Sequence, residues 1–305
     1  MTDAPIPTNT RCGFVALLGA PNAGKSTLMN ALVGAKLSIV SPKVQTTRTR
    51  VTGIIIEDGS QLIFVDTPGI FEPRRRLDRA MVRAAWDGAA DADQVVLLVD
   101  ASHRSLDADS ERIIAALKEA GRSVILVLNK IDLVKREVLL AKAQALNEMF
   151  AFTDTFMISA TTGSGVADLR THLAQRMPEG PWHYPEDEMT DMPLRLLAAE
   201  ITREKLFVSL YQEVPYSLTV ETESWEEFDN GAVKISQTIF IQRDSQKAII
   251  IGKGGQAIRK IREEAQIELQ EMLERQVHLF LFVKVREGWI DDPDRFKPWG
   301  LQWDA

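Results

Sequence analysis

The sequence contains little cysteine and no long apolar run, and both deficits exclude classes of protein. The single cysteine, Cys12, cannot form an internal disulfide, and no Cys-x-x-Cys pair or His/Cys cluster suggests a zinc site. The simplest interpretation is a small buried thiol in a reducing compartment. Residues 1–12 have neither a basic start nor an apolar core, so we expect no signal peptide. No apolar run approaches the roughly 20 residues that span a bilayer, which predicts a cytoplasmic protein and leaves peripheral membrane contact open.

Basic charge is also scarce when the whole chain is counted. Lysine and arginine number 36 against 43 acidic residues, giving a formal charge of -7 and a pI near 5.3. This balance argues against a generally basic nucleic-acid binder, although a net charge can conceal a local basic face. At 305 residues, the chain is long enough for two domains that each bury a core.

Short apolar runs alternate with helical periodicity from residue 13 to about residue 177. This alternation is typical of a parallel sheet covered on both faces, so we predict one doubly wound α/β domain. The strand candidates begin at Phe14, Thr52, Gln61, Gln94, Ser123 and Thr155. The helix candidates lie near residues 25–33, 79–90, 107–120, 135–150 and 166–176.

The second half of the chain follows a different order. Four prolines and several acids between residues 177 and 193 predict an irregular linker. A helix "LRLLAAEITREKLF", two strands "YSLTVETE" and "AVKISQTIFIQ", two helices and a strand "VHLFLFVKVRE" then follow. The charge-rich run "SWEEFDNG" joins the first two strands, with a turn expected at Asn230 and Gly231. This helix, strand, strand, helix, helix, strand order is that of a smaller α+β domain of the prokaryotic KH type (type II).

The stretch "GAPNAGKST" follows the first predicted strand and fits the pattern G-x-x-x-x-G-K-[ST] from Gly19 to Ser26. Gly19 and Gly24 tolerate the dihedrals that turn backbone N–H groups toward phosphates. Lys25 would reach the β and γ phosphates, and Ser26 would ligate Mg²⁺. The alternative is a simple glycine-rich turn, which the position between a strand and a helix disfavours.

Three further motifs follow later strands. In "DTPG", Asp66 can hold Mg²⁺ through water and Gly69 can offer its N–H to the γ phosphate. In "NKID", Asp132 can accept hydrogen bonds from the ring N–H and the exocyclic amine of guanine, a pair that adenine lacks. "SAT", at residues 159–161, follows the sixth strand. Each motif alone could be a turn or a cap, but four in order at strand ends predict a GTP site.

These motifs closely resemble those of translation-factor-related GTPases. Within that class "QTTRTR", from Gln45, resembles the switch I of Era and its relatives, which implies that Thr47, rather than Thr46, caps Mg²⁺ when GTP is bound. The alternative is that both are strand-edge threonines. The metal set is Ser26, Thr47 and Asp66, and the candidate catalytic residues are Lys25, Thr47 and Gly69. The candidate GTP-binding residues are Gly19, Asn22, Ala23, Gly24, Lys25, Ser26, Thr27, Asp66, Gly69, Asn129, Lys130, Asp132, Ser159 and Ala160.

One catalytic residue of Ras-like GTPases, the glutamine that orients the attacking water, is missing from the sequence. Ras-like enzymes place a glutamine after the DxxG glycine to orient the attacking water, but this chain has Ile70 there. We therefore expect slow intrinsic hydrolysis. Asn22 resembles an asparagine that coordinates K⁺ in some members of the class, and it could equally stabilise the loop by hydrogen bonds. The run 74–76, three arginines, could supply an arginine finger or an RNA contact, and a solvated charge run is the preferred interpretation.

The stretch "IIIGKGGQAIRKI", from Ile249, has two incompatible interpretations. As G-x-G-x-x-A it would bind a dinucleotide, but it lacks a sufficient strand, an acid in the required place and room for a second half. As a G-x-x-G loop between two helices it would clamp an RNA backbone. Six basic residues against one acid between Arg243 and Arg262 favour RNA. The candidate RNA-binding residues are Ile251, Gly252, Lys253, Gly254, Gly255, Ile258, Arg259 and Arg262.

A GTPase domain followed by a KH domain resembles the Era family over nearly the whole chain. The expected division is an extension over 1–12, the GTPase domain over 13–177, a linker over 178–192, the KH domain over 193–287 and a tail over 288–305. The resemblance implies GTP/GDP, Mg²⁺ and K⁺ as ligands, binding near the 3′ end of 16S ribosomal RNA, maturation of the small (30S) subunit, and peripheral association with the inner membrane. We expect a monomer, with the tail residues Trp289, Trp299 and Trp303 packed down.

Two other functions remain as alternatives. One is a GTP-regulated membrane or signalling switch whose KH domain binds protein. The other is a metabolic P-loop kinase or ATPase, which Asp132 disfavours. Competition between GTP and ATP separates the kinase from the other two, and RNA binding separates the assembly factor from the signalling switch.

Overall fold

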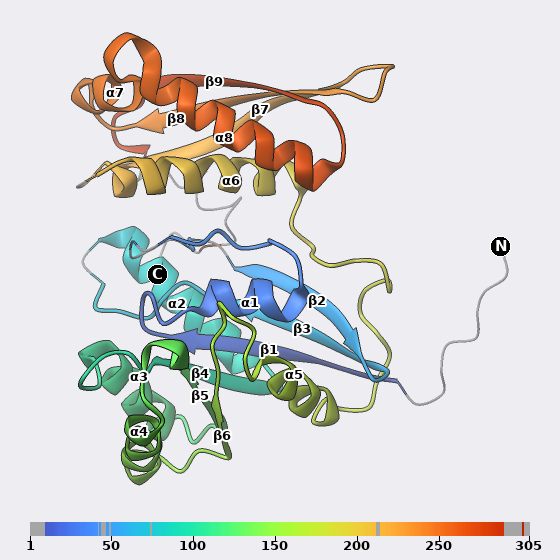
Figure 1. Cartoon of the computed structure of the whole chain (residues 1–305), viewed down its shortest axis with the longest axis vertical. Coiled ribbons are helices and arrows are strands. Elements are labelled where there is room, and N and C mark those ends of the chain that lie inside the picture. Colours follow the sequence, from blue (N-terminus) through green and yellow to red (C-terminus); the bar gives the residue numbers. More distant parts are fainter. Residues whose placement is uncertain are drawn as a thin grey trace, which may run out of the picture. The chain divides into compact units, whose positions relative to one another are not determined.

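The computed structural model describes residues 10–41, 43, 47–48, 50–73, 75–211, 214–289 and 301. The chain divides into two compact units, coloured along the sequence in Figure 1. The first unit contains the described residues of 10–38 and 47–191 together with Leu301, and the second contains those of 39–43 and 192–289. The predicted features at Gln45, Thr46, Arg74, Trp299 and Trp303 lie outside the described residues.

The first unit is built on a six-stranded sheet with the order β2-β3-β1-β4-β5-β6. Its strands are β1 (Arg11–Gly19), β2 (Val51–Glu57), β3 (Ser60–Asp66), β4 (Gln94–Asp100), β5 (Val124–Asn129) and β6 (Asp154–Met157). Five strands are parallel, but β2 runs antiparallel to β3. The expectation of a wholly parallel sheet was wrong at this edge because Asp58 and Gly59, both at positive φ, form a two-residue hairpin turn.

Helices cover both faces of this sheet. They are α1 (Lys25–Val33), α2 (Arg76–Asp91), α3 (Ala108–Glu119), α4 (Arg136–Met149) and α5 (Val166–Gln175). Helices α1 and α5 contribute buried leucines, with Met29, to one core cluster, while α2, α3 and α4 contribute to the other. The strands β4 and β5 are buried on both faces, which explains their continuous apolar runs. The doubly wound α/β fold class is confirmed, and each predicted helix lies within three residues of its expected start.

Residues 178–191, expected as a linker, contain no helix or strand but pack along the first unit. The backbone N–H of Ile54 donates to the carbonyl of Met189 (2.9 Å), and the side-chain oxygen of Gln61 accepts from the N–H groups of His183 (2.8 Å) and Tyr184 (3.1 Å). The rings of Trp182 and Tyr184 lie against a small cluster that includes the buried Cys12. This segment therefore belongs to the first unit by its contacts.

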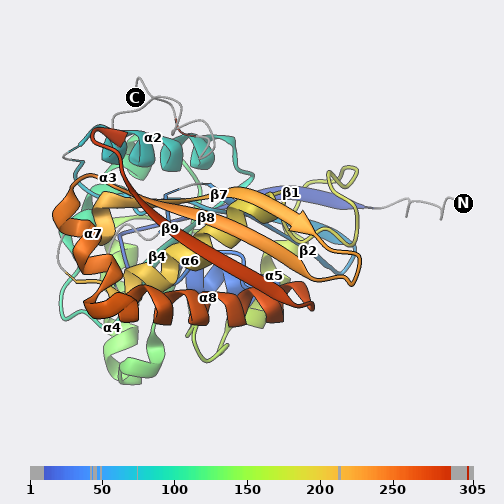
Figure 2. The ribbon, with the colours of Figure 1, turned by 90° about the horizontal axis from the view of Figure 1, so that it is seen from above.

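The second unit has a three-stranded sheet with the order β7-β8-β9, and the helices α6 (Leu194–Ser209) and α8 (Gln256–Leu273) lie along one face of it (Figure 2). The elements are α6 (Leu194–Ser209), β7 (Leu218–Glu227), β8 (Val233–Ile241), α7 (Asp244–Ile251), α8 (Gln256–Leu273) and β9 (Val277–Val285). Strand β8 pairs antiparallel with β7 and parallel with β9. The predicted αββααβ order is confirmed, except that the first half of the charge-rich run is strand, because β7 continues to Glu227.

The end of this unit is held by Trp289. Its side chain is fully buried, and its indole N–H donates to the carbonyl of Ser217 (3.2 Å). This contact fits the expectation that tail aromatic residues pack down. Among the described residues, no helix has both the length and the apolar character required to cross a bilayer.

Candidate functional site

The phosphate-loop motif lies between β1 and α1, as predicted. Gly19 ends β1, and a Cβ placed on it would approach the carbonyl oxygen of Leu98 to 2.6 Å. Gly24 adopts a φ of 100°, and a Cβ there would lie 2.2 Å from Nδ2 of Asn129. Asn22 also adopts a positive φ of 63°. The backbone of this loop is therefore fixed in a conformation that side chains other than hydrogen would obstruct at both glycines.

Lys25 begins α1 and is buried beneath this loop. Its Nζ donates to the carbonyls of Gly19 and Ala20, each at 3.0 Å. Burial lowers the pKa of the Lys25 ammonium to about 8, although the nearby Asp66 carboxylate opposes the change. An anion bound in the loop would restore the stability of the charged form, so the amine is prepared to receive phosphate.

Three side chains converge beside the start of α1. The hydroxyl of Ser26 donates to Oδ2 of Asp66 (2.7 Å) and lies 2.8 Å from Oγ1 of Thr47, which is itself 3.4 Å from the same carboxylate oxygen. Asp66 is fully buried at the end of β3, and burial raises its pKa against the opposing effects of Lys25 and the hydroxyls. Its other oxygen, Oδ1, is buried without a hydrogen-bond partner.

This arrangement fits Mg²⁺. A hard cation prefers oxygen ligands and is commonly held by one or two protein groups together with phosphate oxygens and water. Ser26, Thr47 and Asp66 supply two hydroxyls and a carboxylate, and Oδ1 of Asp66 is a buried acceptor without a hydrogen-bond partner in the described part of the chain. The sequence-predicted metal set is thus brought together by β3, α1 and the segment before β2.

Asn129 connects the phosphate loop to the "SAT" loop. Its Nδ2 donates to the carbonyl of Ala23 (2.9 Å), and its Oδ1 accepts from the backbone N–H of Ala160 (3.0 Å). Asn129 and Ser159 are both buried. The predicted phosphate-binding and base-binding loops therefore form one hydrogen-bonded assembly at the carboxyl ends of the strands.

Of the two charged residues that follow Asn129, Lys130 is paired with another side chain and Asp132 is exposed. Lys130, at a φ of 64°, donates from Nζ to Oδ2 of Asp100 (2.6 Å) at the end of β4. Asp132 lies in a 3₁₀ turn, is exposed, and has no hydrogen-bond or ion-pair partner among the described residues. A carboxylate held in the open beside the buried Asn129 can accept two donors from a purine ring.

In the segment after β3, the position at which Ras-like enzymes have a glutamine is occupied by the buried Ile70. Gly69 lies against Pro21, because a Cβ on it would approach the Pro21 backbone to 3.1 Å. The N–H of Ile70 donates to the carbonyl of Gly19 (3.2 Å), and its side chain is buried in the core with Ala16 and Leu18. The structure therefore uses Ile70 as a core residue.

Of the predicted arginine run, Arg75 precedes α2 and Arg76 begins it.

The glycine-rich loop of the second unit joins α7 and α8. Gly252 has a φ of 70°, and a Cβ on it would meet Cβ of Ala257 at 2.7 Å. Gly254 and Gly255 also have positive φ, at 60° and 77°, but open space surrounds both. Lys253, between Gly252 and Gly254, is exposed. Gly252 is thus required for helix packing, while Gly254 and Gly255 leave the outside of the loop accessible.

The positive charge of the segment from Arg243 to Arg262, beside this loop, is partly balanced by the acids that directly follow it, Glu263 and Glu264. The Arg262 guanidinium lies 3.1 Å from both Gln266 and Glu263, and Lys260 lies 3.8 Å from Glu264. Arg259 and Lys253 are both exposed. Ile258 packs in part against the core of this unit, so only a fraction of its surface is available to a ligand.

Two features of the site were not predicted. Asp100, which orients Lys130, is at a strand end like the other functional residues, and that position was the available signal. In the second unit, Val40 and Lys43 contact α6 and its C-cap: the N–H of Val40 donates to Oε1 of Glu204 (2.7 Å), and Lys43 donates to the carbonyls of Phe207 and Leu210. These contacts involve residues more than 160 positions apart, and no local pattern reveals them.

The fold and site together define a P-loop GTPase joined to a KH-type unit. A family model for 50S ribosome-binding GTPases matches residues 14–130, and a KH domain model matches residues 213–290. GTPase Era of Sinorhizobium medicae (strain WSM419) is 61% identical over 298 residues, which cover 98% of this chain and 95% of that protein. GTPase Era of Agrobacterium fabrum is 60% identical, with 98% and 94% covered.

Solved structures agree with these relatives. A crystal structure of Era in complex with MgGDPNP and nucleotides 1506–1542 of 16S ribosomal RNA is 38% identical, with a TM-score of 0.90, and the match covers 95% of this chain and 99% of that one. An Aquifex aeolicus Era variant bound to GDP·AlF4⁻ matches with the same identity, TM-score and coverage. The chain belongs to the Era GTPase family, and the predicted family resemblance is confirmed.

Proposed function

We propose that this GTPase binds GTP and Mg²⁺ at the β1–α1 site, hydrolyses GTP slowly, and binds 16S ribosomal RNA near its 3′ end during maturation of the small subunit. One observation carries the proposal: a single chain holds both the Ser26–Thr47–Asp66 convergence and the open G-x-x-G loop. The Era structure with MgGDPNP and a 16S fragment supports the same ligands for this chain.

At the nucleotide site, binding is divided among side chains with distinct tasks. Lys25 supplies positive charge to the β and γ phosphates, Gly69 offers a backbone N–H near the γ phosphate, and Asp132 selects guanine. Ser26, Thr47 and Asp66 would hold Mg²⁺, which when bound neutralises charge that develops on the phosphates. Asn129, Ser159 and Ala160 support the base-binding side through the contacts described above.

Slow hydrolysis follows from the lack of a side chain that can orient water at position 70. Ile70 is buried, so the chain must obtain the missing positive charge or water contact from elsewhere. Asn22 remains our candidate for a K⁺ ligand, with loop stabilisation as the alternative. Hydrolysis rates in KCl and NaCl at equal ionic strength test this role, since equal rates in the two salts would remove it.

For RNA, we propose that Gly254 and Gly255 allow the sugar–phosphate backbone to approach closely, while Lys253, Arg259 and Arg262 contribute charge and Ile251 and Ile258 contact bases. A short single-stranded RNA matching the 16S 3′ end is the probe. Gly255→Asp places a carboxylate in the open loop, and Gly255→Asn is its uncharged control of matching shape, because both residues tolerate positive φ.

We expect Gly255→Asp to weaken RNA binding at least about tenfold relative to Gly255→Asn, because it opposes phosphate at close range. Equal RNA affinity of the two variants would contradict the clamp. Undiminished GTP binding by both variants separates this outcome from damage to the GTPase unit. A chain that binds GTP but no 16S RNA would instead favour a GTP-regulated membrane or signalling switch whose KH domain binds protein.

The remaining parts of the proposal rest on family resemblance and the observed chain order. They are a GTPase domain over 13–177, a linker over 178–192, a KH domain over 193–287, a tail over 288–305, a monomeric state, and a cytoplasmic location with peripheral contact at the inner membrane. Co-sedimentation of the full chain with vesicles of inner-membrane lipids tests the last of these. Recovery of all of the protein in the supernatant would exclude it.

A further inference from the structure

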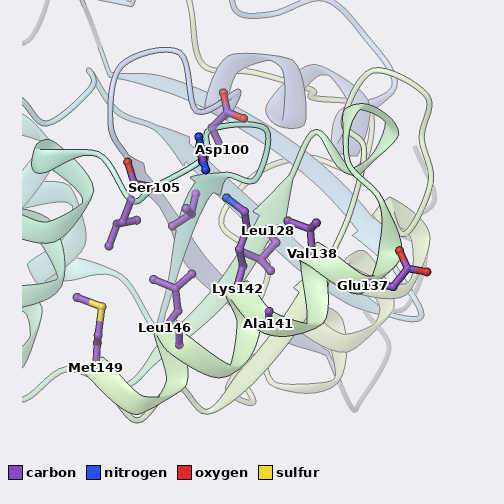
Figure 3. Close-up of a pocket in the computed structure, with 13 residues that line it drawn as sticks. Asp100, Ser105, Leu128, Glu137, Val138, Ala141, Lys142, Leu146 and Met149 are labelled. Atoms are coloured by element: carbon purple, nitrogen blue, oxygen red, sulfur yellow. The ribbon is translucent and has the colours of Figure 1, made fainter.

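A cavity of about 560 Å³ lies on the α4 side of the first unit, away from the residues assigned to phosphate and magnesium (Figure 3). Its apolar wall is formed from β4, β5, the segment before α3 and one face of α4. The larger apolar residues of the lining are Val99, Leu106, Leu128, Val138, Leu146 and Met149. A hollow of this size is in the range of small-molecule sites in proteins.

Helix α4 presents an apolar stripe to the cavity instead of burying it. Val138, Ala141, Ala145 and Met149 are spaced by three or four residues, so they share one face of the helix. Such a stripe normally covers a core. Here Val138 is 44% exposed and Met149 is 45% exposed, so apolar surface is left in water where a ligand could cover it.

Polar groups gather at one end of the cavity. Figure 3 shows the amine of Lys142 directed toward the end that contains Asp100, whereas the carboxylate of Glu137 points away from the apolar group. Ser105 and Arg104 also line the cavity, and Arg104 makes no ion pair among the described residues. Lys142 donates to the carbonyl of His103, which keeps its ammonium in this region.

The acid at this end is already neutralised. Oδ2 of Asp100 accepts from Lys130 at 2.6 Å, and its Oδ1 accepts from the hydroxyl of Ser102 at 2.6 Å. Because Asp100 is paired with Lys130 and the Glu137 carboxylate points away, the charges left for a ligand at this end are the cations of Lys142 and Arg104. The cavity therefore combines an apolar body with a cationic end.

We propose that this cavity, between α4 and the segment before α3, binds a small amphiphilic anion, with its apolar part against Leu128, Leu146 and Met149 and its acidic group near Lys142 and Arg104. The ligand class is a single acyl or aryl body with one carboxylate or comparable anionic group. The apolar wall supplies affinity through burial, and the cations set the orientation and the preference for negative charge.

Octanoate is the probe, and calorimetric titration of the full chain in its GDP-bound form is the measurement. We expect saturable binding of octanoate. Acetate, which lacks the chain, should bind at least about 100-fold more weakly, because it buries almost no apolar surface. Octyltrimethylammonium, with the opposite charge, should bind at least about tenfold more weakly than octanoate.

Paired variants locate the site. Ala145→Trp fills the cavity from an exposed position on α4 and should abolish octanoate binding, whereas Gln144→Trp, on the preceding residue and outside the lining, should leave it unchanged. Lys142→Glu should weaken binding roughly tenfold. Lys118→Glu makes the same charge change on α3, outside the lining, and should have no effect.

The proposal is overturned if octanoate shows no saturable binding, if binding survives Ala145→Trp, or if octyltrimethylammonium binds as tightly as octanoate. Circular dichroism and GDP binding verify that each variant is folded. Should Ala145→Trp fail to fold, Lys142→Glu against Lys118→Glu still decides whether the anion lies in this cavity. Equal loss in those two variants would contradict the proposed orientation.

Discussion

Replacing Gly24 by alanine should weaken GDP binding by about 100-fold to 1,000-fold, through a clash with Asn129. The new Cβ would lie 2.2 Å from Nδ2 of Asn129, so the amide must move. Moving it breaks its bonds to Ala23 (2.9 Å) and Ala160 (3.0 Å), which together contribute about 2 kcal/mol at ~1 kcal/mol each. A side chain at a φ of 100° adds about 1–2 kcal/mol of backbone strain.

The size of the effect follows from the binding-competent fraction. If the substitution raises the free energy of the binding-competent loop conformation by ~3–4 kcal/mol, the free energy of GDP binding becomes less favourable by the same amount. Asn129→Ala alone removes the two hydrogen bonds and should weaken GDP binding by about 30-fold. The assay is titration of each protein with a fluorescent GDP analogue in excess Mg²⁺, together with GDP competition.

A double-mutant cycle separates the clash from the strain. In the Asn129→Ala background the amide is absent, so Gly24→Ala should cost only the strain of about 1–2 kcal/mol. The coupling between the two positions is then about 2 kcal/mol. Additive effects, equal within about 0.5 kcal/mol in both backgrounds, would refute the steric argument. Gly34→Ala, at a φ of 75° with open space around it, is the control for strain without a clash.

Four further predictions concern three other residues of the site. Because the pKa of Lys25 is about 8 in the free protein, GDP binding without Mg²⁺ at pH 8 should take up about half a proton, measured from the dependence of binding enthalpy on buffer, and Lys25→Met should abolish the uptake. The same low pKa means that the nucleotide-free protein gains stability as pH rises from about 8 toward 10.5, so a urea midpoint that falls in this range would contradict it. Asp132→Ala should reduce the preference for GTP over ATP by at least ~100-fold in competition titrations, and an unchanged preference would remove Asp132 from the base site. Ile70→Gln should lower the unfolding free energy by about 1–3 kcal/mol without faster GTP hydrolysis, because the side chain is buried, whereas accelerated turnover would show that position 70 reaches water.

The nucleotide motifs could be predicted because their determinants are local. Each one follows a strand whose apolar run is visible in the sequence, and parallel strands bring their carboxyl ends to one edge of a sheet. Ser26, Thr47 and Asp66 lie within hydrogen-bonding distance of one another, and their role as metal ligands stays a prediction. Their detailed partners depend on elements up to 40 residues apart, yet the strand-end rule was sufficient to locate them.

The features that were missed depend on contacts rather than on patterns. The antiparallel direction of β2 was overlooked although Asp58-Gly59 is a strong hairpin signal between two apolar runs. The packing of residues 178–191 through Gln61 could not be anticipated, because a proline-rich composition predicts irregular backbone and not its position. The segment counted as basic, Arg243 to Arg262, ended one residue before Glu263, which pairs with Arg262. The net positive charge beside the loop was therefore overestimated.

The cavity beside α4 could not be predicted from the sequence either. Helical periodicity identifies the apolar stripe of Val138, Ala141, Ala145 and Met149, but periodicity alone does not reveal whether a stripe meets a packed neighbour or a hollow. That distinction depends on the small volume of the alanines and on the position of the segment before α3. It becomes visible only after the tertiary structure is assembled.

The single amide of Asn129 also fixes a length. By holding Ala23 on one side and Ala160 on the other, it keeps the phosphate-binding and base-binding halves at a constant separation. A ligand that matches this separation engages both halves at once, and the second contact is formed at high effective concentration. A guanine joined to its phosphates by a longer or shorter connection would engage one half at a time. We therefore expect the site to select nucleotides by the distance between their ends as well as by the chemistry of each end.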